Sequence, residues 1–390
     1  MNNFDQQLSR KNTGSIKWDF MEKIYNIPNA ENIIPMWIAD MDFAAPQIIT
    51  EAISKRLEKP IFGYSYEVDP CADSIVNWLE RRHNWTITSD QIIYHQGVVP
   101  AIATAVEALT APSDSILVNS PVYPPFFMIP AKLGREVVYS PLLEDRGRYS
   151  FDFNNFEEQV KKPEVTMFIL CHPHNPAGVA WDEDTLRKID ELCFANNVVV
   201  VSDEIHSDLM LNGSKHIPLA KVSAHPENIV TCFAPTKTYN IAGIQAAMVI
   251  SCDSHKRLEM QNAIASHGQM GLNVFAIAAV EAAFSEEAEK WLHDLIQYLN
   301  KNIDYTIDTI SKAIPSVKIN RPDATYLLWV DIRETGFTEK EIMQKLLDAG
   351  VALDPGTKYG QAFEGFLRMN IACTSDTLKE AVSRFIKAFA

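Results

Sequence analysis

The sequence lacks the features that would place this protein in a membrane, secrete it or hold it together with disulfides. No stretch approaches the roughly 18 uninterrupted apolar residues of a membrane-spanning helix. The first seven residues, Met1 to Gln7, lack the basic region and apolar core of a secretory signal. The six cysteines are scattered and form no Cys-x-x-Cys pair, which favours reduced thiols over disulfides or zinc. We therefore expect a cytoplasmic protein without a metal site.

Positive charge is also scarce. The chain has 35 Lys and Arg against 50 Asp and Glu, a formal net charge of −15. Such a charge argues against nucleic acid and anionic membranes as partners. Apolar residues make up 47% and charged residues 22% of the 390 residues, a composition typical of soluble globular proteins, and this length favours two domains.

In the central part of the chain, short apolar runs alternate with segments whose apolar residues recur at helical spacing, as in α/β proteins. Unbroken apolar runs such as 165–170 and 198–201 predict strands that are buried on both faces. We predict helices at 46–57, 72–83, 100–109, 125–133, 182–196, 273–284 and 286–314. One mostly parallel seven-stranded sheet is predicted from strands at 91–95, 115–118, 136–139, 165–170, 198–201, 228–233 and 246–251.

The last hundred residues have a different pattern. Two apolar strands, 324–331 and 365–370, precede a helix that begins near Asp376, which predicts a smaller α+β unit. We therefore predict an N-terminal arm over residues 1–45 that joins the small domain, a large domain over 46–286 and a small C-terminal domain over 287–390.

One lysine stands out because of its surroundings. Lys237 follows an apolar run, predicted as a buried strand, and lies among small and hydroxylated residues in Ala234-Pro-Thr-Lys-Thr238. Lysines are rarely buried without a partner. Burial would lower the pKa of this amine and leave it free to form a Schiff base. An ordinary surface lysine is the alternative, and residues upstream decide between the two.

Other polar and aromatic groups follow the ends of other predicted strands, where ligands bind in open α/β sheets. Gly97 precedes a helix start whose amides suit a phosphate, and Tyr123 could stack on a planar ligand or pack in the core. Asn175 stands in a turn, and Asp203 follows four valines, where a carboxylate needs a cation. Asp40 and Asp42 end an apolar segment and are interpreted as turn residues.

Together these strand ends offer phosphate-binding amides, a stacking ring, an amide, a carboxylate and a Schiff-base lysine. Pyridoxal phosphate requires that set of groups. The carboxylate keeps the pyridine nitrogen protonated, the amide bonds the ring hydroxyl, and the lysine carries the aldehyde and later moves protons. We therefore predict pyridoxal 5′-phosphate as the cofactor.

The order and spacing of these residues resemble the fold-type I pyridoxal phosphate enzymes of the aminotransferase class I/II superfamily. Asn175 stands in an Asn-Pro-x-Gly turn, with Asp203 and Lys237 following in the order of that superfamily. Within it, the chain is most similar to the MalY/PatB group of cystathionine β-lyases, or C–S lyases. The segments that carry this similarity are Met36-Trp-Ile-Ala-Asp-Met-Asp-Phe43, Tyr64, Gly97-Val-Val-Pro100, Asp203-Glu-Ile-His206, Lys237-Thr-Tyr-Asn-Ile-Ala-Gly243 and Arg368.

The resemblance implies a role for each matched position. Lys237, Tyr123 and Asp203 would be catalytic, and Arg368 would bind the substrate carboxylate as a bidentate pair. Tyr64 would reach the phosphate of the neighbouring subunit, so a homodimer with shared active sites is implied. The other positions implied to contact the cofactor are Gly97, Val98, Val99, Asn175, Thr236 and His206. Those implied to contact the substrate are Ala39, Asn175 and Tyr64.

Three positions depart from the common pattern of the superfamily. The arginine usual eight residues after the lysine is Gln245, and the tyrosine usual three residues after the aspartate is His206. Both changes favour the lyase branch. After Cys373, Thr374-Ser375 replaces a Pro-Arg pair, a change that we expect to touch the substrate entrance.

The resulting hypothesis is α,β-elimination from a sulfur amino acid, such as L-cystathionine to homocysteine, pyruvate and ammonia. One alternative is an aminotransferase, which uses the same residues but returns the proton to the cofactor. Another is a regulatory protein that keeps the fold and binds a transcription factor. The presence of Lys237, Asp203 and Arg368 argues for catalysis.

Overall fold

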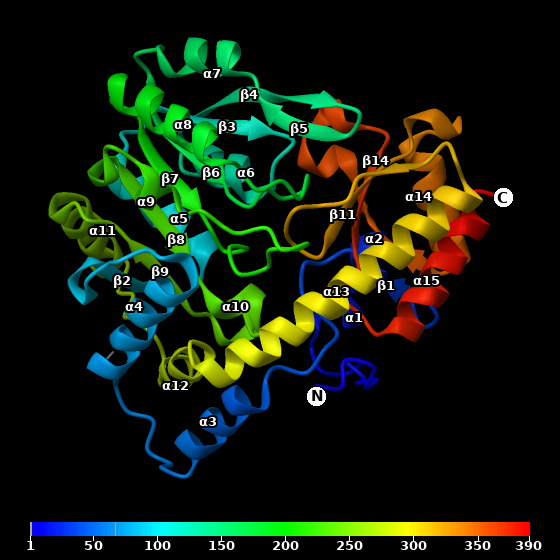
Figure 1. Cartoon of the computed structure of the whole chain (residues 1–390), viewed down its shortest axis with the longest axis horizontal. Helices are drawn as coiled ribbons and strands as arrows, with labels where there is room; N and C mark the ends of the chain where they lie inside the picture. The colour runs from blue at the N-terminus through cyan, green and yellow to red at the C-terminus, as the bar shows by residue number, and fades with distance from the viewer. Residues whose placement is uncertain (1, 67) are drawn as a thin grey trace.

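The unbroken apolar runs of the central chain form one eight-stranded sheet in the computed structural model, which describes residues 2–66 and 68–390 (Figure 1). Its strands are β2 (Ile92–His95), β3 (Ser115–Ser120), β4 (Glu136–Asp145), β5 (Arg148–Phe151), β6 (Val165–Cys171), β7 (Val199–Asp203), β8 (Ile229–Phe233) and β9 (Ala247–Ile250). They lie in the order β2-β9-β8-β7-β6-β3-β4-β5. Neighbours pair in parallel from β8 to β4, while β9 and β5 run in the opposite direction. The predicted α/β fold with a mostly parallel sheet is confirmed.

The prediction of seven strands missed β5. This strand returns antiparallel to β4 at the sheet edge, with Leu142 opposite Phe151. The turn residues Arg146 and Gly147 have φ values of 50° and 79°, as a two-residue type I′ hairpin requires. Because β5 alternates exposed and buried residues, it shows no apolar run.

Helices occupy the connections between strands and most of the C-terminal part. They are α1 (Ile16–Asp19), α2 (Met21–Tyr25), α3 (Gln47–Leu57), α4 (Asp69–His83), α5 (Val98–Leu109), α6 (Pro125–Lys132), α7 (Phe153–Val160), α8 (Glu183–Ala195), α9 (Leu219–Val222), α10 (Pro235–Thr238), α11 (Ser254–Ser266), α12 (Val274–Ala283), α13 (Glu286–Ala313), α14 (Glu339–Ala349) and α15 (Ser375–Ala388). No described helix combines the length and apolar character needed to traverse a lipid bilayer.

The central strands β6, β7 and β8 of the large sheet are buried on both faces. Successive residues of a strand point to opposite faces of the sheet. In β6, Met167 and Ile169 pack in one cluster with residues of α5, α6 and α11. Phe168 and Leu170 pack in another cluster with residues of α7, α8 and α9. This covering on both sides explains why the strands read as unbroken apolar runs.

A smaller sheet lies beyond the long helix α13, which crosses the molecule in Figure 1. Its strands are β10 (Lys318–Ile319), β11 (Leu327–Asp331), β13 (Asp354–Pro355) and β14 (Phe366–Asn370), antiparallel in the order β10-β11-β14-β13. From the N-terminal arm, β1 (Ile34–Pro35) pairs in parallel with β12 (Val351–Ala352). The domain boundaries at 45 and 286 stay a prediction, and residues 1 and 67, which fall inside the predicted arm and large domain, lie outside the described residues.

Candidate active site

The predicted site residues gather at one edge of the large sheet. Strands β2, β3, β6, β7 and β8 all point the same way, so their carboxyl ends meet there. Gly97, Tyr123, Asn175 and Lys237 stand within four residues after the ends of β2, β3, β6 and β8, and Asp203 is the last residue of β7.

Lys237 lies on α10, the short helix that begins two residues after β8. Its side chain is partly buried, and its Nζ donates a hydrogen bond of 2.5 Å to the carbonyl oxygen of Ala39. Burial lowers the pKa of the amine to about 8, although the nearby Asp40 carboxylate acts in the opposite direction. At pH 7 about one in ten of these side chains would therefore carry the free amine that a nucleophile or base requires.

Asp203 ends β7 and is buried at the same edge. Burial raises the pKa of its carboxyl to about 7, while the Ile205 amide, a hydrogen-bond donor to Oδ1 at 3.0 Å, and Lys237 lower it. No Lys, Arg or His of the described chain forms an ion pair with Asp203. A cationic ligand placed beside this carboxylate would ionise it.

Arg368 comes from β14 of the smaller sheet and reaches the same region. It is 3% exposed, and its Nη1 donates to the side-chain oxygen of Asn175 at 3.2 Å. Nη2 donates to the carbonyl oxygen of Trp37 at 2.6 Å and to Asp354 at 2.8 Å. Nε is buried without a partner among the described residues. A buried guanidinium with an unpaired donor suits an incoming carboxylate.

The segment Trp37–Asp42 joins these two cations. Its carbonyl oxygens accept hydrogen bonds from Arg368 at Trp37 and from Lys237 at Ala39, and Tyr326 also donates to Ala39, at 3.0 Å. The predicted substrate-binding residue Ala39 is thus in contact with Lys237.

Asp40 and Asp42 do more than form a turn. Arg10 makes ion pairs with both, at 2.7 and 2.9 Å, and the fully buried Lys17 lies 2.8 Å from Asp42. These pairs hold the N-terminal arm against the segment that contacts Lys237. Arg10 and Lys17 were not predicted as site residues, because no local signal links them to partners more than twenty residues away.

The N-terminal end of α5 lies next to the same edge. Gly97 precedes it with φ of 124°, a conformation that favours glycine. Val98 and Val99 provide the first two backbone amides of the helix, which have no intrahelical acceptor. Thr236, buried on α10 beside Lys237, adds a hydroxyl. Amides and a hydroxyl of this kind suit a phosphate.

The remaining predicted residues differ in position. Burial raises the pKa of Tyr123, which lies in the turn between β3 and α6. Burial lowers the pKa of His206 to about 3, so its imidazole is neutral at neutral pH, and its Nδ1 has no partner among the described residues. Tyr64 is 96% exposed, in the connection between α3 and α4. It is the one predicted site residue that the solvent surrounds.

The chain resembles known proteins over nearly its whole length. The sequence model of the aminotransferase class I and II family matches residues 40–385. The chain belongs to the aminotransferase class I and II family. Cystathionine β-lyase PatB of Bacillus subtilis (strain 168) is 45% identical over 388 residues, which cover 99% of both chains. The resemblance to the MalY/PatB group is therefore confirmed.

Solved structures of family relatives have the same fold over the whole chain. Cystalysin from Treponema denticola, whose structure contains a pyridoxal 5′-phosphate cofactor, has a TM-score of 0.96 at 32% identity. The PLP-bound C–S lyase from Staphylococcus hominis has a TM-score of 0.92 at 29% identity. Each match covers 100% of this chain and 98% of the relative.

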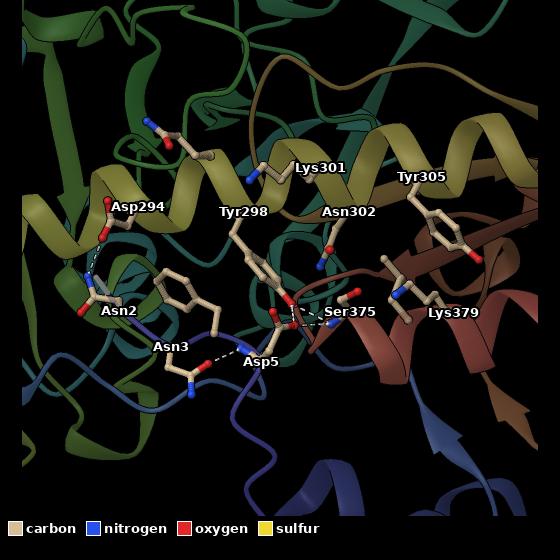
Figure 2. Close-up of a pocket in the computed structure, with 13 residues that line it drawn as sticks. Asn2, Asn3, Asp5, Asp294, Tyr298, Lys301, Asn302, Tyr305, Ser375 and Lys379 are labelled. Carbon is tan, nitrogen blue, oxygen red and sulfur yellow. Dashed lines mark hydrogen bonds between the residues drawn. The ribbon is translucent and has the colours of Figure 1, made fainter.

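At the third departure from the superfamily pattern, Thr374-Ser375, the start of α15 contacts the N-terminal arm. The amide of Ser375, at the start of α15, donates to the Tyr298 hydroxyl at 2.6 Å and to Asp5 at 3.2 Å, and Tyr298 also donates to Asp5 (Figure 2). These residues line a pocket of about 630 Å³ between the N-terminal arm, α13 and α15, which contains none of the predicted site residues. Ser375 therefore binds the N-terminal arm.

Proposed function

We propose that this chain is a pyridoxal 5′-phosphate-dependent carbon–sulfur lyase that carries out α,β-elimination on sulfur amino acids such as L-cystathionine. The observation that carries the proposal is the meeting of Lys237, with its lowered pKa, Asp203 and Arg368 at one sheet edge. A chain 45% identical to a cystathionine β-lyase supports the choice of reaction.

The residues present fit the cofactor. Asp203 is a buried carboxylate without an ion-pair partner in the described chain, as a protonated ring nitrogen requires. The α5 amides of Val98 and Val99, preceded by Gly97, together with the Thr236 hydroxyl, would hold the phosphate. Asn175 would bond the ring hydroxyl, Tyr123 would stack on the ring and His206 would lie close to it.

When bound, pyridoxal 5′-phosphate supplies an aldehyde for the substrate amine and a ring that stabilises negative charge at the α-carbon. Arg368 would bind the substrate carboxylate through its unpaired Nε, with Asn175 and Ala39 beside it. The free amine of Lys237 would take the proton from the α-carbon. The carbon–sulfur bond then breaks, the thiolate leaves with the bonding electrons, and the enamine product takes up water to give pyruvate and ammonia.

A product assay separates a lyase from an aminotransferase, which would use the same residues. The cofactor-loaded protein is incubated with L-cystathionine and no keto acid, and pyruvate and free thiol are measured over time. A lyase releases both continuously and in equal amounts. Turnover that begins only when a keto acid is added would make the protein an aminotransferase instead.

The rate at which the protein captures the cofactor should rise with pH, because only the deprotonated amine of Lys237 can react with the aldehyde. Below a pKa of about 8 the ammonium has no lone pair, so the capture rate should fall about tenfold for each pH unit. Above that pH it should level off. Stopped-flow absorbance of the apoprotein mixed with pyridoxal 5′-phosphate measures this rate, and a profile flat between pH 6 and 9 would contradict it.

Substrate binding should depend on the geometry of Arg368 as well as its charge. Arg368→Lys keeps the charge but removes the planar pair of donors, so KM should rise about 30-fold, or about 2 kcal/mol. The cofactor absorbance should not change. Arg333→Lys, in the half-exposed turn after β11, is the matched control, and an equal KM in the two variants would contradict the role of Arg368.

We further propose a homodimer with shared sites, which the exposed position of Tyr64 supports. Ile61, Phe62, Tyr64 and Tyr66 are all more than half exposed, an apolar patch typical of an interface. Phe62 and Tyr64 line one pocket together with Gln96, the residue before Gly97. In a two-fold dimer each copy presents the same patch, so Tyr64 would complete the phosphate site of the partner. A cytoplasmic location accords with six scattered cysteines that form no Cys-x-x-Cys pair.

A further inference from the structure

A buried carboxylate, Asp354, lies behind Arg368. It stands opposite Arg368 in the pairing of β13 with β14 and is 2% exposed. Its Oδ2 accepts hydrogen bonds from Arg368 at 2.8 Å and from the Tyr359 hydroxyl at 2.9 Å. Its Oδ1 accepts one from Lys358 Nζ at 2.8 Å. One carboxylate is therefore shared by two cations.

Lys358 retains donors that Asp354 does not use. The carboxylate of an amino-acid substrate would compensate Arg368, and Asp354 would stay the partner of Lys358. A second anionic group would therefore be bound by the remaining donors of Lys358, and not by an excess of positive charge. The Lys358 side chain is 43% exposed, and its ammonium has three donors, of which one bonds Asp354. Lys358 can therefore receive a second anionic group from the solvent side.

Lys358 lines a pocket of about 470 Å³ next to the candidate active site. The rings of Phe127, Tyr139 and Phe363 form part of its wall, and so does Ser120, the last residue of β3. The pocket adjoins the turn that holds Tyr123, because the amide of Val122 donates to the carbonyl oxygen of Tyr359 at 3.2 Å. Its wall thus combines apolar rings with one ammonium.

We propose that this pocket receives the leaving group of the thioether and that Lys358 binds a carboxylate carried by that leaving group. The inference rests on the proposed function and names a substrate class for that site. The rings suit methylene groups and sulfur, and the ammonium suits a carboxylate. A thioether with an amino-acid group at each end, such as cystathionine, uses both parts of the pocket. A simple S-alkyl cysteine uses only the apolar part.

Substitution of Lys358 by methionine tests this subsite. Lys358→Met should lower kcat/KM for L-cystathionine about tenfold, a typical cost of losing one charged hydrogen bond, and leave kcat/KM for S-ethyl-L-cysteine within about twofold. Lys358→Arg should retain most of the preference for cystathionine. The control is Lys379→Met, in another pocket on α15, which should change neither value.

Two results would overturn the proposal. Equal losses of kcat/KM on both substrates would mean that Lys358 acts only on Arg368, through Asp354. An unchanged kcat/KM on both would mean that Lys358 contacts neither substrate. Binding of two non-reacting amino acids to the loaded protein gives a second readout. L-2-aminoadipate, with a far carboxylate, should bind more tightly than L-norleucine to the wild type but not to Lys358→Met. If the wild type released no pyruvate from any thioether, the proposed function would fail, while this comparison would still decide the role of Lys358.

Discussion

Replacement of Lys237 by alanine is expected to abolish turnover. The substrate would lose the group that takes its α-proton, and the cofactor would lose its covalent attachment, so kcat should fall by at least about 10³-fold. Pyruvate release from L-cystathionine under saturating substrate measures this loss. The fold should not change, because the Ala39 carbonyl that accepts from the amine also accepts from the Tyr326 hydroxyl at 3.0 Å and so keeps a donor.

The matched control for this variant is Lys215→Ala. Lys215 is exposed in the loop before α9, so its loss should leave kcat within about twofold, as most surface substitutions do. Near-native pyruvate release by Lys237→Ala would contradict the assignment of the reaction to this site.

Replacement of Asp203 by asparagine is expected to give the second largest loss. Asparagine has nearly the same shape but no charge, so it cannot keep a proton on the ring nitrogen. We expect kcat to fall about 10² to 10³-fold, the range typical of removing one electrostatic partner of a reacting group. Steady-state kinetics at saturating cofactor measures the effect, which separates it from weaker cofactor binding.

A carboxylate on the smaller sheet, Asp331, provides the control for Asp203. Asp331→Asn removes a partly exposed carboxylate that pairs with Arg333, and kcat should stay within about twofold. If Asp203→Asn retained more than about half of the wild-type kcat, the ring nitrogen would not depend on this residue.

The strand-end residues could be predicted from the sequence because the parallel sheet brings them together. Once the apolar runs were read as parallel strands, the groups following them had to meet at one edge. Lys237 and Asp203 fall at that edge for this reason. The resemblance to a known family added Arg368, which lies 131 residues beyond Lys237 in the other sheet.

The surroundings of these residues could not be predicted in the same way. Asp354 contacts Arg368 because the two residues stand opposite each other in the pairing of β13 with β14. Strand β13 has only two residues and therefore no periodic pattern from which this pairing could be predicted. Arg10 and Lys17 meet Asp40 and Asp42 only because the N-terminal arm folds back. Strand β5 was missed although Asp145-Arg-Gly-Arg148 contains a turn signal, because the strand has no apolar run.

The central claim is that Lys237 is the residue to which the cofactor is attached. Reduction of the cofactor-loaded protein with borohydride, followed by digestion and mass spectrometry, tests it directly. We predict the pyridoxyl mass increment on the peptide that contains Lys237, and its absence from the same peptide of Lys237→Ala. A stoichiometric increment on any other lysine, with Lys237 unmodified, would contradict the account.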